Sequence, residues 1–272
     1  MDRKLLKSQA KNLIRTSDPK PVYMAIIYLV IIAVLSFLSY KIVGGSTEAI
    51  SAQFTNGFRF SINEYGEYAP SVDPEQYYYA LQEAMPTPAE SLLDIAISLV
   101  TTVLGAGFTI FVLRTLSGSG ASYWNIFDGF GMFFRIIWLY ILEGVFIFLW
   151  ALLLIFPAFI AYYRYRMAIY LLLEHPEMSA LECISESKRL MAGRKWELFV
   201  LDLSFIGWAV LVGIANFISS ELAIPVVSVI GFGILVQIYF LPYYELTCAG
   251  YYRQLTAPPA DPDPFNGWTP NL

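Results

Sequence analysis

Long apolar runs constrain the fold of this chain more than any other feature. The hydrocarbon core of a bilayer is about 30 Å thick and needs roughly 17–25 apolar residues per helix. The run Ile136–Leu173 is too long for one helix, and Pro157 interrupts it, since a proline costs a helix interior about 3 kcal/mol. We therefore predict an all-α polytopic membrane protein, a six-transmembrane-helix bundle with short cytoplasmic interfacial helices. The predicted spans are Val22–Val43, Ser91–Leu113, Phe134–Phe156, Ala158–Leu173, Trp196–Ile218 and Ile224–Leu246.

Composition excludes several classes of protein. Of the 272 residues, 57% are hydrophobic and 14% are charged, against about 25% charged in ordinary soluble domains. So few charges cannot cover a soluble surface, which argues against a soluble enzyme and against disorder. A net charge of -5 gives no reason to expect nucleic acid as a partner. Two cysteines and one histidine leave little material for a metal site, so we expect no metal and no cofactor.

Basic residues predict how the spans are oriented. The first run is longer than the roughly 7–15 residues of a signal-peptide core, and no small-x-small cleavage site follows it, so we interpret it as an uncleaved anchor. Six spans place both termini on one side. If that side is cytoplasmic, the inner segments hold 13 lysines and arginines, and the outer segments hold only Lys41 and Arg59. The positive-inside rule therefore predicts cytoplasmic N- and C-termini.

The only long loop lies between the first two spans. It is acidic and rich in aromatic residues, and Phe58–Ile62 alternates as a strand does. Two interpretations stay open: a lid whose aromatic side chains lie at the membrane interface, or a receptor surface for a cationic or peptide ligand. We expect a single six-span membrane domain over 1–255, with the loop 44–90 outside, a cytoplasmic helix over 179–192 and a flexible proline-rich cytoplasmic tail over 256–272.

The cytoplasmic helix is predicted from a capping box. Ser179 and Glu182 have the spacing of such a box, and Gly193 has the place of a helix stop. The basic residues near its end either anchor the topology or contact anionic lipid headgroups, each with about 1 kcal/mol. The candidate headgroup contacts are Lys188, Arg189, Arg194 and Lys195.

Charged residues inside the predicted spans are the candidates for a buried site. Such groups are costly in lipid, usually face the bundle interior and usually have partners. At 1.5 Å per residue, four of them fall at similar heights in the inner half of the membrane, and a fifth lies nearer the cytoplasmic end. We predict a salt bridge from one of the two arginines to Glu143 or Asp202. The cluster either fixes helix packing or lines a polar cavity for a headgroup, a solute or a proton; its members are Glu143, Arg164, Arg166, Asp202 and Glu245.

A short internal echo is visible. The pattern Tyr163-x4-Ala168-x-Tyr170 is similar to Tyr244-x4-Ala249-x-Tyr251, and each has a proline upstream. The echo is typical of a parallel repeat of a helical hairpin. Chance similarity among apolar residues is the alternative explanation.

No familiar catalytic pattern is present. The chain has no Walker A loop, no dinucleotide fingerprint, no His-Glu-x-x-His and no Gly-x-Ser-x-Gly. His175 stands alone, so we interpret it as structural. Cys183 and Cys248 both fall on the predicted cytoplasmic side, where reducing conditions disfavour a disulfide. We therefore expect that the protein is not an enzyme.

Four segments resemble a known family. They are Tyr163–Tyr170, Ser179–Met191, Gly193–Trp208 and Pro242–Leu255. Together they are similar to the bacterial integral-membrane family called domain of unknown function 975, which resembles the membrane domains attached to some glycerophosphodiester phosphodiesterases. The resemblance implies a membrane architecture, a bacterial source and the cytoplasmic membrane. It implies no activity.

The sequence is compatible with two hypotheses for the function. The leading hypothesis is a non-enzymatic membrane module that binds membrane lipids or another membrane protein, for instance as a transporter accessory. The alternative is a small transporter or exporter of a solute or peptide that uses the buried charge cluster. A water-filled path to Arg164 or Arg166 would favour transport, and a dry, fully paired cluster would favour the module.

Overall fold

A computed structural model describes residues 3–57, 60–62, 68–70, 75, 78–79, 82, 85–221 and 232–257. This part of the chain is helical apart from one antiparallel pair of short strands, in which Ser61 lies opposite Ala69. The strand predicted around Phe58–Ile62 is therefore confirmed from Phe60 onward. The elements are α1 Arg3–Thr16, α2 Pro21–Gly57, β1 Phe60–Ile62, β2 Tyr68–Pro70, α4 Pro88–Ser117, the 3₁₀ helix η1 Tyr123–Met132, α5 Phe133–Leu153, α6 Ile155–Tyr165, α7 Ala168–Glu174, α8 Ala180–Leu190, α9 Lys195–Leu203, α10 Ile206–Glu221 and α12 Gly233–Thr256.

Three helical segments in the described part are long and apolar enough to cross a membrane. They are Pro21–Val43 in α2, Pro88–Ser117 (all of α4) and Tyr123–Leu153 (η1 with α5). The pair α9 and α10, bent by 46°, makes a fourth if it is one span. These segments match the first, second, third and fifth predicted runs. The sixth run falls partly on residues 222–231, which lie outside the described residues.

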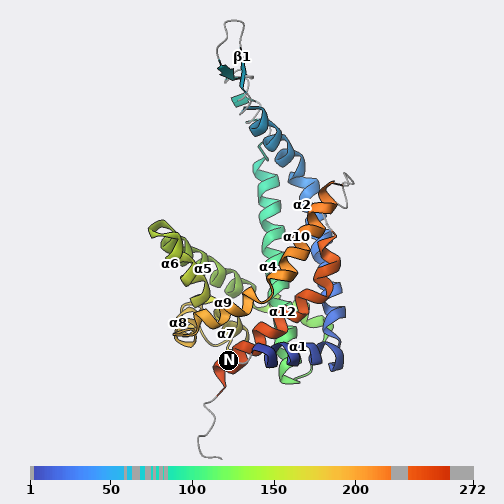
Figure 1. Ribbon diagram of the computed structural model, residues 1–272, viewed down its shortest axis with the longest axis vertical. Coiled ribbons are helices and arrows are strands. Elements are labelled where there is room, and N and C mark those ends of the chain that lie inside the picture. The colour runs from blue at the N-terminus through green and yellow to red at the C-terminus, as the bar shows by residue number, and fades with distance from the viewer. Residues whose placement is uncertain are drawn as a thin grey trace, which may run out of the picture.

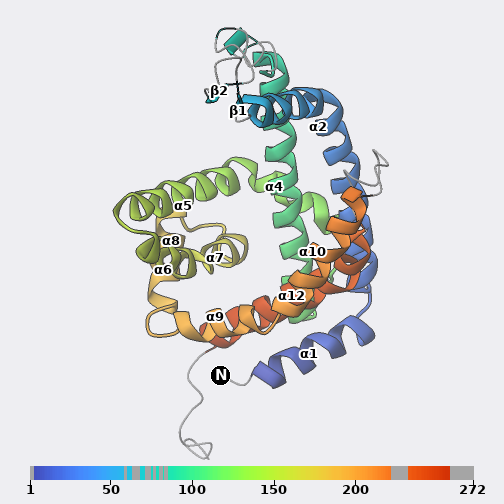
Figure 2. The same cartoon turned by 45° about the horizontal axis from the view of Figure 1, so that its top comes forward.

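The helices form a main group and a side arm. In Figure 1, α2 and α4 run side by side, α10 and α12 lie against them, and α1 crosses the base of the group. The arm is the α5–α6 hairpin, and Figure 2 shows it directed away from α4. Helix α2 continues to Gly57, well past the predicted span end at Val43, and carries the chain toward the β1–β2 pair.

The turn of the α5–α6 hairpin lies three residues before the proline that predicted it. Leu154 has an extended backbone, with φ -163° and ψ 149°, and Pro157 is the third residue of α6. A proline in the first turn of a helix is tolerated, because that N–H would have no partner within the helix. The residues around the turn are apolar and exposed, with Ile155 84% and Phe156 83% exposed, as expected of a surface that faces lipid.

The predicted fourth span, Ala158–Leu173, is not one continuous helix. It breaks after Tyr165, and α7 begins at Ala168. The buried hydroxyl of Ser187, from α8, fills the break: it accepts a bond from the Met167 N–H (3.2 Å) and donates one to the Arg164 carbonyl (2.8 Å). A side-chain hydroxyl that replaces lost helix bonds makes such a break tolerable at membrane depth.

Ser187→Ala is expected to destabilise the protein by about 1–3 kcal/mol, because it leaves a buried N–H and a partly buried carbonyl without their partner. The free energy of unfolding in mixed detergent micelles measures the effect. Ser185→Ala, at an exposed position of the same helix, is the matched control and should change little. Equal stability of the two variants would show that the hydroxyl does not support the break.

Helix α8 begins where the sequence predicted. The Glu182 N–H donates to the Ser179 hydroxyl at 3.3 Å, and the Ser179 N–H donates to the Glu182 carboxylate at 2.7 Å, so the predicted capping box is present. These bonds hold the pKa of Glu182 below its ordinary value. Gly193 follows with φ +74°, in the left-handed region that favours glycine.

Two glycines bring η1 against α4. A Cβ on Gly107 would overlap the backbone of Ile126, and a Cβ on Gly129 would lie 2.5 Å from the Val103 carbonyl oxygen. Only glycine permits backbones to approach this closely. The contact fixes η1 beside the last turns of α4, which matters for the cavity described below.

Helix α1 packs through one apolar stripe. Leu6, Ala10 and Ile14, spaced by four residues, are buried. Lys7 reaches the bend between α9 and α10: its Nζ donates to the Ser204 carbonyl at 3.0 Å and lies 4.0 Å from the centre of the Phe205 ring. The first helix of the chain therefore contacts elements that follow it by about two hundred positions.

Candidate functional site

Asp202, on α9, is the centre of the predicted charge cluster. Its two carboxylate oxygens accept hydrogen bonds from different helices: one from the Tyr163 hydroxyl of α6 at 3.1 Å and one from the Tyr244 hydroxyl of α12 at 3.0 Å. Three helices are joined at one carboxylate. We call Asp202, Tyr163, Tyr244 and Arg166 the tyrosine network.

Arg166 joins this network through a tyrosine and not through an acid. One terminal nitrogen donates to the Tyr244 hydroxyl at 2.9 Å. The guanidinium carbon lies 5.7 Å from the ring centre of Tyr162 and 5.9 Å from that of Tyr244, within the range of a cation–π interaction. The Nε of Arg166 is buried and has no hydrogen-bond partner.

The predicted direct salt bridge is wrong. Among the described residues, no ion pair within 4.0 Å links Arg164 or Arg166 to Glu143 or Asp202. The physical reason lies in the hydroxyl of Tyr244, which accepts from Arg166 on one side and donates to Asp202 on the other. A neutral group with both a donor and an acceptor can bridge two opposite charges in this way.

The other candidates lie near the network but do not form one site with it. Glu245 accepts a hydrogen bond from the buried Tyr170 hydroxyl at 3.3 Å. Within the described part of the chain, Glu143 has no hydrogen-bond or ion-pair partner, and the side chain of Arg164 has none either. The structure therefore brings Arg166 and Asp202 together and leaves Glu143 and Arg164 outside the network.

The tyrosines were missed at the sequence level, although one signal was available. Tyr163 and Tyr244 occupy equivalent positions of the internal echo, and both donate to Asp202. Tyr170 is a further member of the echo and donates to Glu245. Echoed tyrosines are thus the hydrogen-bond donors of the half-buried acids Asp202 and Glu245.

The four predicted headgroup contacts have different surroundings. Lys188 lies 5.5 Å from the ring centres of both Phe146 and Tyr165, so it is directed toward the α5–α6 hairpin. Arg189 pairs with Glu186 one turn earlier, with its Nε 2.8 Å from the carboxylate. That hydrogen bond lowers the pKa of the Glu186 carboxyl. Arg194 is exposed and Lys195 half-buried.

A cavity of about 930 Å³ lies at one end of the main group of helices. It is formed by the ends of α4, α7 and α12 together with η1, and we call it the end cavity. Two ion pairs lie in its wall: Arg114 Nη1 to Asp128 Oδ2 at 3.1 Å, and Arg253 Nη2 to Glu174 Oε1 at 2.5 Å. Its size is typical of a small-molecule pocket, which measures roughly 300–1,000 Å³.

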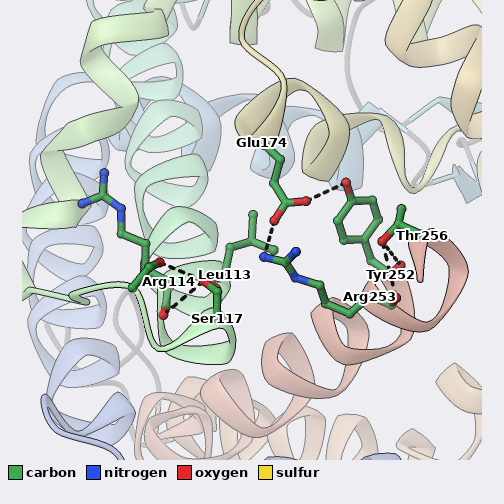
Figure 3. Close-up of polar contacts among 8 residues, drawn as sticks. Leu113, Arg114, Ser117, Glu174, Tyr252, Arg253 and Thr256 are labelled. Atoms are coloured by element: carbon green, nitrogen blue, oxygen red, sulfur yellow. Dashed lines mark hydrogen bonds and ion pairs between the residues drawn. The ribbon is translucent and has the colours of Figure 1, made fainter. Parts of the chain in front are cut away.

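Glu174 is held from two sides. In Figure 3 it lies between Arg253 and Tyr252, and the Tyr252 hydroxyl donates to it at 2.9 Å. Burial, together with the adjacent carboxylate, raises the pKa of Tyr252. The phenol therefore stays protonated and serves as the hydrogen-bond donor. The guanidinium of Arg114 points away from this pair in the same view. The two ion pairs therefore lie at separate places in the wall.

Histidine and cysteine provide no obvious metal site in the described ranges. No group of three or more metal-ligating side chains is found there. His175 Nδ1 lies 3.1 Å from Glu177, and both cysteines are buried and unbridged.

These features define a helical protein with several helices that can cross a membrane. Residues 151–258 match the family described as "Protein of unknown function (DUF975)", which confirms over that range the resemblance inferred from the four segments. The tyrosine network lies within the matched range, whereas the part of the end cavity wall that α4 and η1 form, with Arg114 and Asp128, lies before it. No curated protein and no solved structure matches the chain.

Proposed function

We propose that this chain is a six-span protein of the bacterial cytoplasmic membrane, with both termini cytoplasmic, that binds membrane lipid and performs no catalysis. Two features support the proposal of six crossings: the apolar runs, and the strong asymmetry of basic residues between alternate segments. A second membrane protein is the other partner that such a module could hold, for instance as the accessory subunit of a transporter.

One observation carries the choice of a binding module: the tyrosine network holds Asp202 and Arg166 in contacts between helices. Both oxygens of Asp202 accept hydroxyls, and Arg166 is flanked by two aromatic rings. In the described part of the chain, neither Arg164 nor Arg166 lines the end cavity or three smaller pockets. Charges that are hydrogen-bonded within one network rigidify the packing of the helices that carry them, and this supports a packing role over a transport path.

A specific observation favours the alternative, a small transporter of a solute or peptide. The buried Nε of Arg166 lacks a partner, and an unsatisfied donor on a buried cation is a natural place for a passing anion or water. Solute flux into liposomes that contain the protein, compared with the Arg166→Met variant, tests this alternative. Flux that depends on Arg166 would support transport and contradict the module.

The proposed function is tested by extracting the protein in native-lipid particles and identifying what remains bound by mass spectrometry. We expect one lipid class to be retained in a fixed ratio to the protein after delipidating washes. If a second membrane protein is retained and no lipid is enriched, the partner of the module is a protein and not a lipid. Recovery of bulk lipid composition alone would contradict the module.

Labelling of introduced cysteines tests the proposed topology. Single cysteines at positions 56 and 186, introduced with Cys183→Ala and Cys248→Ala, should react with a membrane-impermeant thiol reagent from opposite sides of the membrane. Position 56 is expected to react from outside in intact cells, and position 186 only after permeabilisation. The reverse result, or reaction of both from one side, would refute six crossings with cytoplasmic termini.

A further inference from the structure

In a membrane that α4 crosses, the end cavity would lie at the depth of the lipid headgroups, whichever way the protein faces. Its wall includes the last turn of α4, with Arg114 and Ser117, and α4 ends at Ser117 after a stretch long enough to cross a membrane. The end of such a span meets the headgroup layer.

Aromatic side chains on η1 mark the same level. Trp124 is 76% exposed, and Phe127 and Phe130 are also exposed; Phe127 lines the cavity itself. Large aromatic side chains with one apolar and one wet side are enriched at membrane–water interfaces. The cavity therefore opens where headgroups are the most abundant solutes.

The charges in the wall determine which headgroup fits. Two arginines and two carboxylates give a formal balance of zero, in two pairs contributed by α4 with η1 and by α7 with α12. A purely anionic ligand that recruited an arginine would separate it from its acid and leave a carboxylate without compensation, which is costly in a partly buried site. A ligand with both charges compensates each member.

The pairs are open enough to exchange partners. The side chains of Arg114 and Asp128 are 43% and 38% exposed, and that of Arg253 is 42% exposed. A guanidinium carries five N–H donors, and each ion pair given above uses one nitrogen of its arginine. Donors are thus left for a phosphate, which arginine binds well, while a carboxylate of the same pair accepts from an ammonium group.

We infer that the end cavity binds a zwitterionic headgroup that carries a phosphate and a primary ammonium group, as in phosphatidylethanolamine. The phosphate contacts Arg114 or Arg253, and the ammonium contacts Asp128 or Glu174. This inference depends on the proposed lipid binding and gives it a site and a lipid class.

The test uses the full chain reconstituted in nanodiscs that contain equal amounts of phosphatidylethanolamine, phosphatidylglycerol and phosphatidylcholine. Native mass spectrometry of the released protein gives the lipid bound. We expect phosphatidylethanolamine to be enriched over both others. Phosphatidylglycerol lacks an ammonium group, and the ammonium of phosphatidylcholine carries three methyl groups and therefore no N–H donor. Preference for phosphatidylglycerol, or no preference, would overturn the inference.

A charge-swapped variant separates binding from folding. Arg114→Asp combined with Asp128→Arg keeps the ion pair and the net charge but exchanges the two positions, and it should lower the enrichment about tenfold, the equivalent of 1.4 kcal/mol. Arg15→Gln, at an exposed position of α1 that does not line the cavity, is the control and should leave the enrichment unchanged. Arg253→Glu combined with Glu174→Arg tests the other pair in the same way. If both folded swapped variants bind as the parent does, the cavity is not the site.

Two further outcomes locate a failure. If no lipid of any class is retained, the proposed function fails together with the site. If lipid is retained but neither swapped variant has an effect, only the site fails. Soluble phosphoethanolamine is the third arm. If this probe binds to the cavity but the lipid is not enriched, the cavity recognises a phosphate with an ammonium group, and the ligand is a soluble molecule and not a lipid.

Discussion

Gly107→Ala is expected to destabilise the protein by about 3 kcal/mol, at the upper end of the usual cost of overpacking. The added methyl group would overlap the Ile126 carbonyl group, whose carbon would lie 2.5 Å from it. The obstacle is backbone and not the flexible end of a side chain, so η1 must move away from α4. Unfolding in mixed micelles gives the free energy, and lipid enrichment by the end cavity should fall as well, because η1 carries Asp128.

The same helix offers a control of opposite sign. A Cβ on Gly105 would meet only the Tyr28 hydroxyl at an ordinary 3.6 Å, so Gly105→Ala should be neutral or slightly stabilising, because alanine favours a helix over glycine by up to about 1 kcal/mol. Gly107→Ala with the stability of Gly105→Ala would mean that η1 does not pack against α4 at this distance.

Asp202→Ala is expected to cost about 3–5 kcal/mol, the range for removing one partner of a buried charge network. The change leaves the hydroxyls of Tyr163 and Tyr244 without their acceptor and removes the acid that Tyr244 links to Arg166. Adding Arg166→Met to Asp202→Ala should recover part of the loss, because no buried cation then remains. Unfolding of the two single variants and the double variant measures the coupling.

Two tyrosines provide the comparison for this cycle. Tyr244→Phe removes the bridge and should couple to Arg166→Met, whereas Tyr162→Phe keeps the ring beside Arg166 and removes a hydroxyl that bridges nothing in the network. Strict additivity of Arg166→Met with both Tyr244→Phe and Asp202→Ala would show that the network does not act as a unit.

Run length predicted three of the helices that are long and apolar enough to cross a membrane, and a fourth if α9 and α10 are one span, because about twenty consecutive apolar residues permit few alternatives to a span. The N-termini of helices were predictable for a similar reason: the box from Ser179 to Glu182 satisfies its N–H groups from within four residues. Local chemistry determines such features, so local sequence contains them.

The break between α6 and α7 was not predictable in that way. Nothing in Tyr163–Tyr170 ends a helix; the hydroxyl that makes the break tolerable comes from Ser187 on another helix. The partner of Asp202 was misjudged for a related reason. Charge and depth indicated an arginine, but a tyrosine can be apolar along its ring and polar at its tip, so composition does not reveal which role it takes.

The end cavity could not be predicted at all. Its wall combines Arg114, Asp128, Glu174 and Arg253, which lie far apart along the chain. From the sequence alone, Arg114 and Arg253 are explained just as well as basic residues that orient the ends of spans. Only the packing of η1 on α4, and of α12 beside α7, brings the four charges into one wall.

The docking of α1 has a consequence for the order in which the protein is made. Its Lys7 contacts Ser204 and Phe205, and the helix packs beside α12. Ribosomes add about 5–20 residues per second, so roughly 10–40 seconds separate the synthesis of Lys7 from that of its partner. Until then the apolar stripe formed by Leu6, Ala10 and Ile14 lacks its final partners. An amphipathic helix in this state can bind the membrane surface through its apolar face. Helix α1 can therefore reach its final place only after α9 and the bend that follows it have been made.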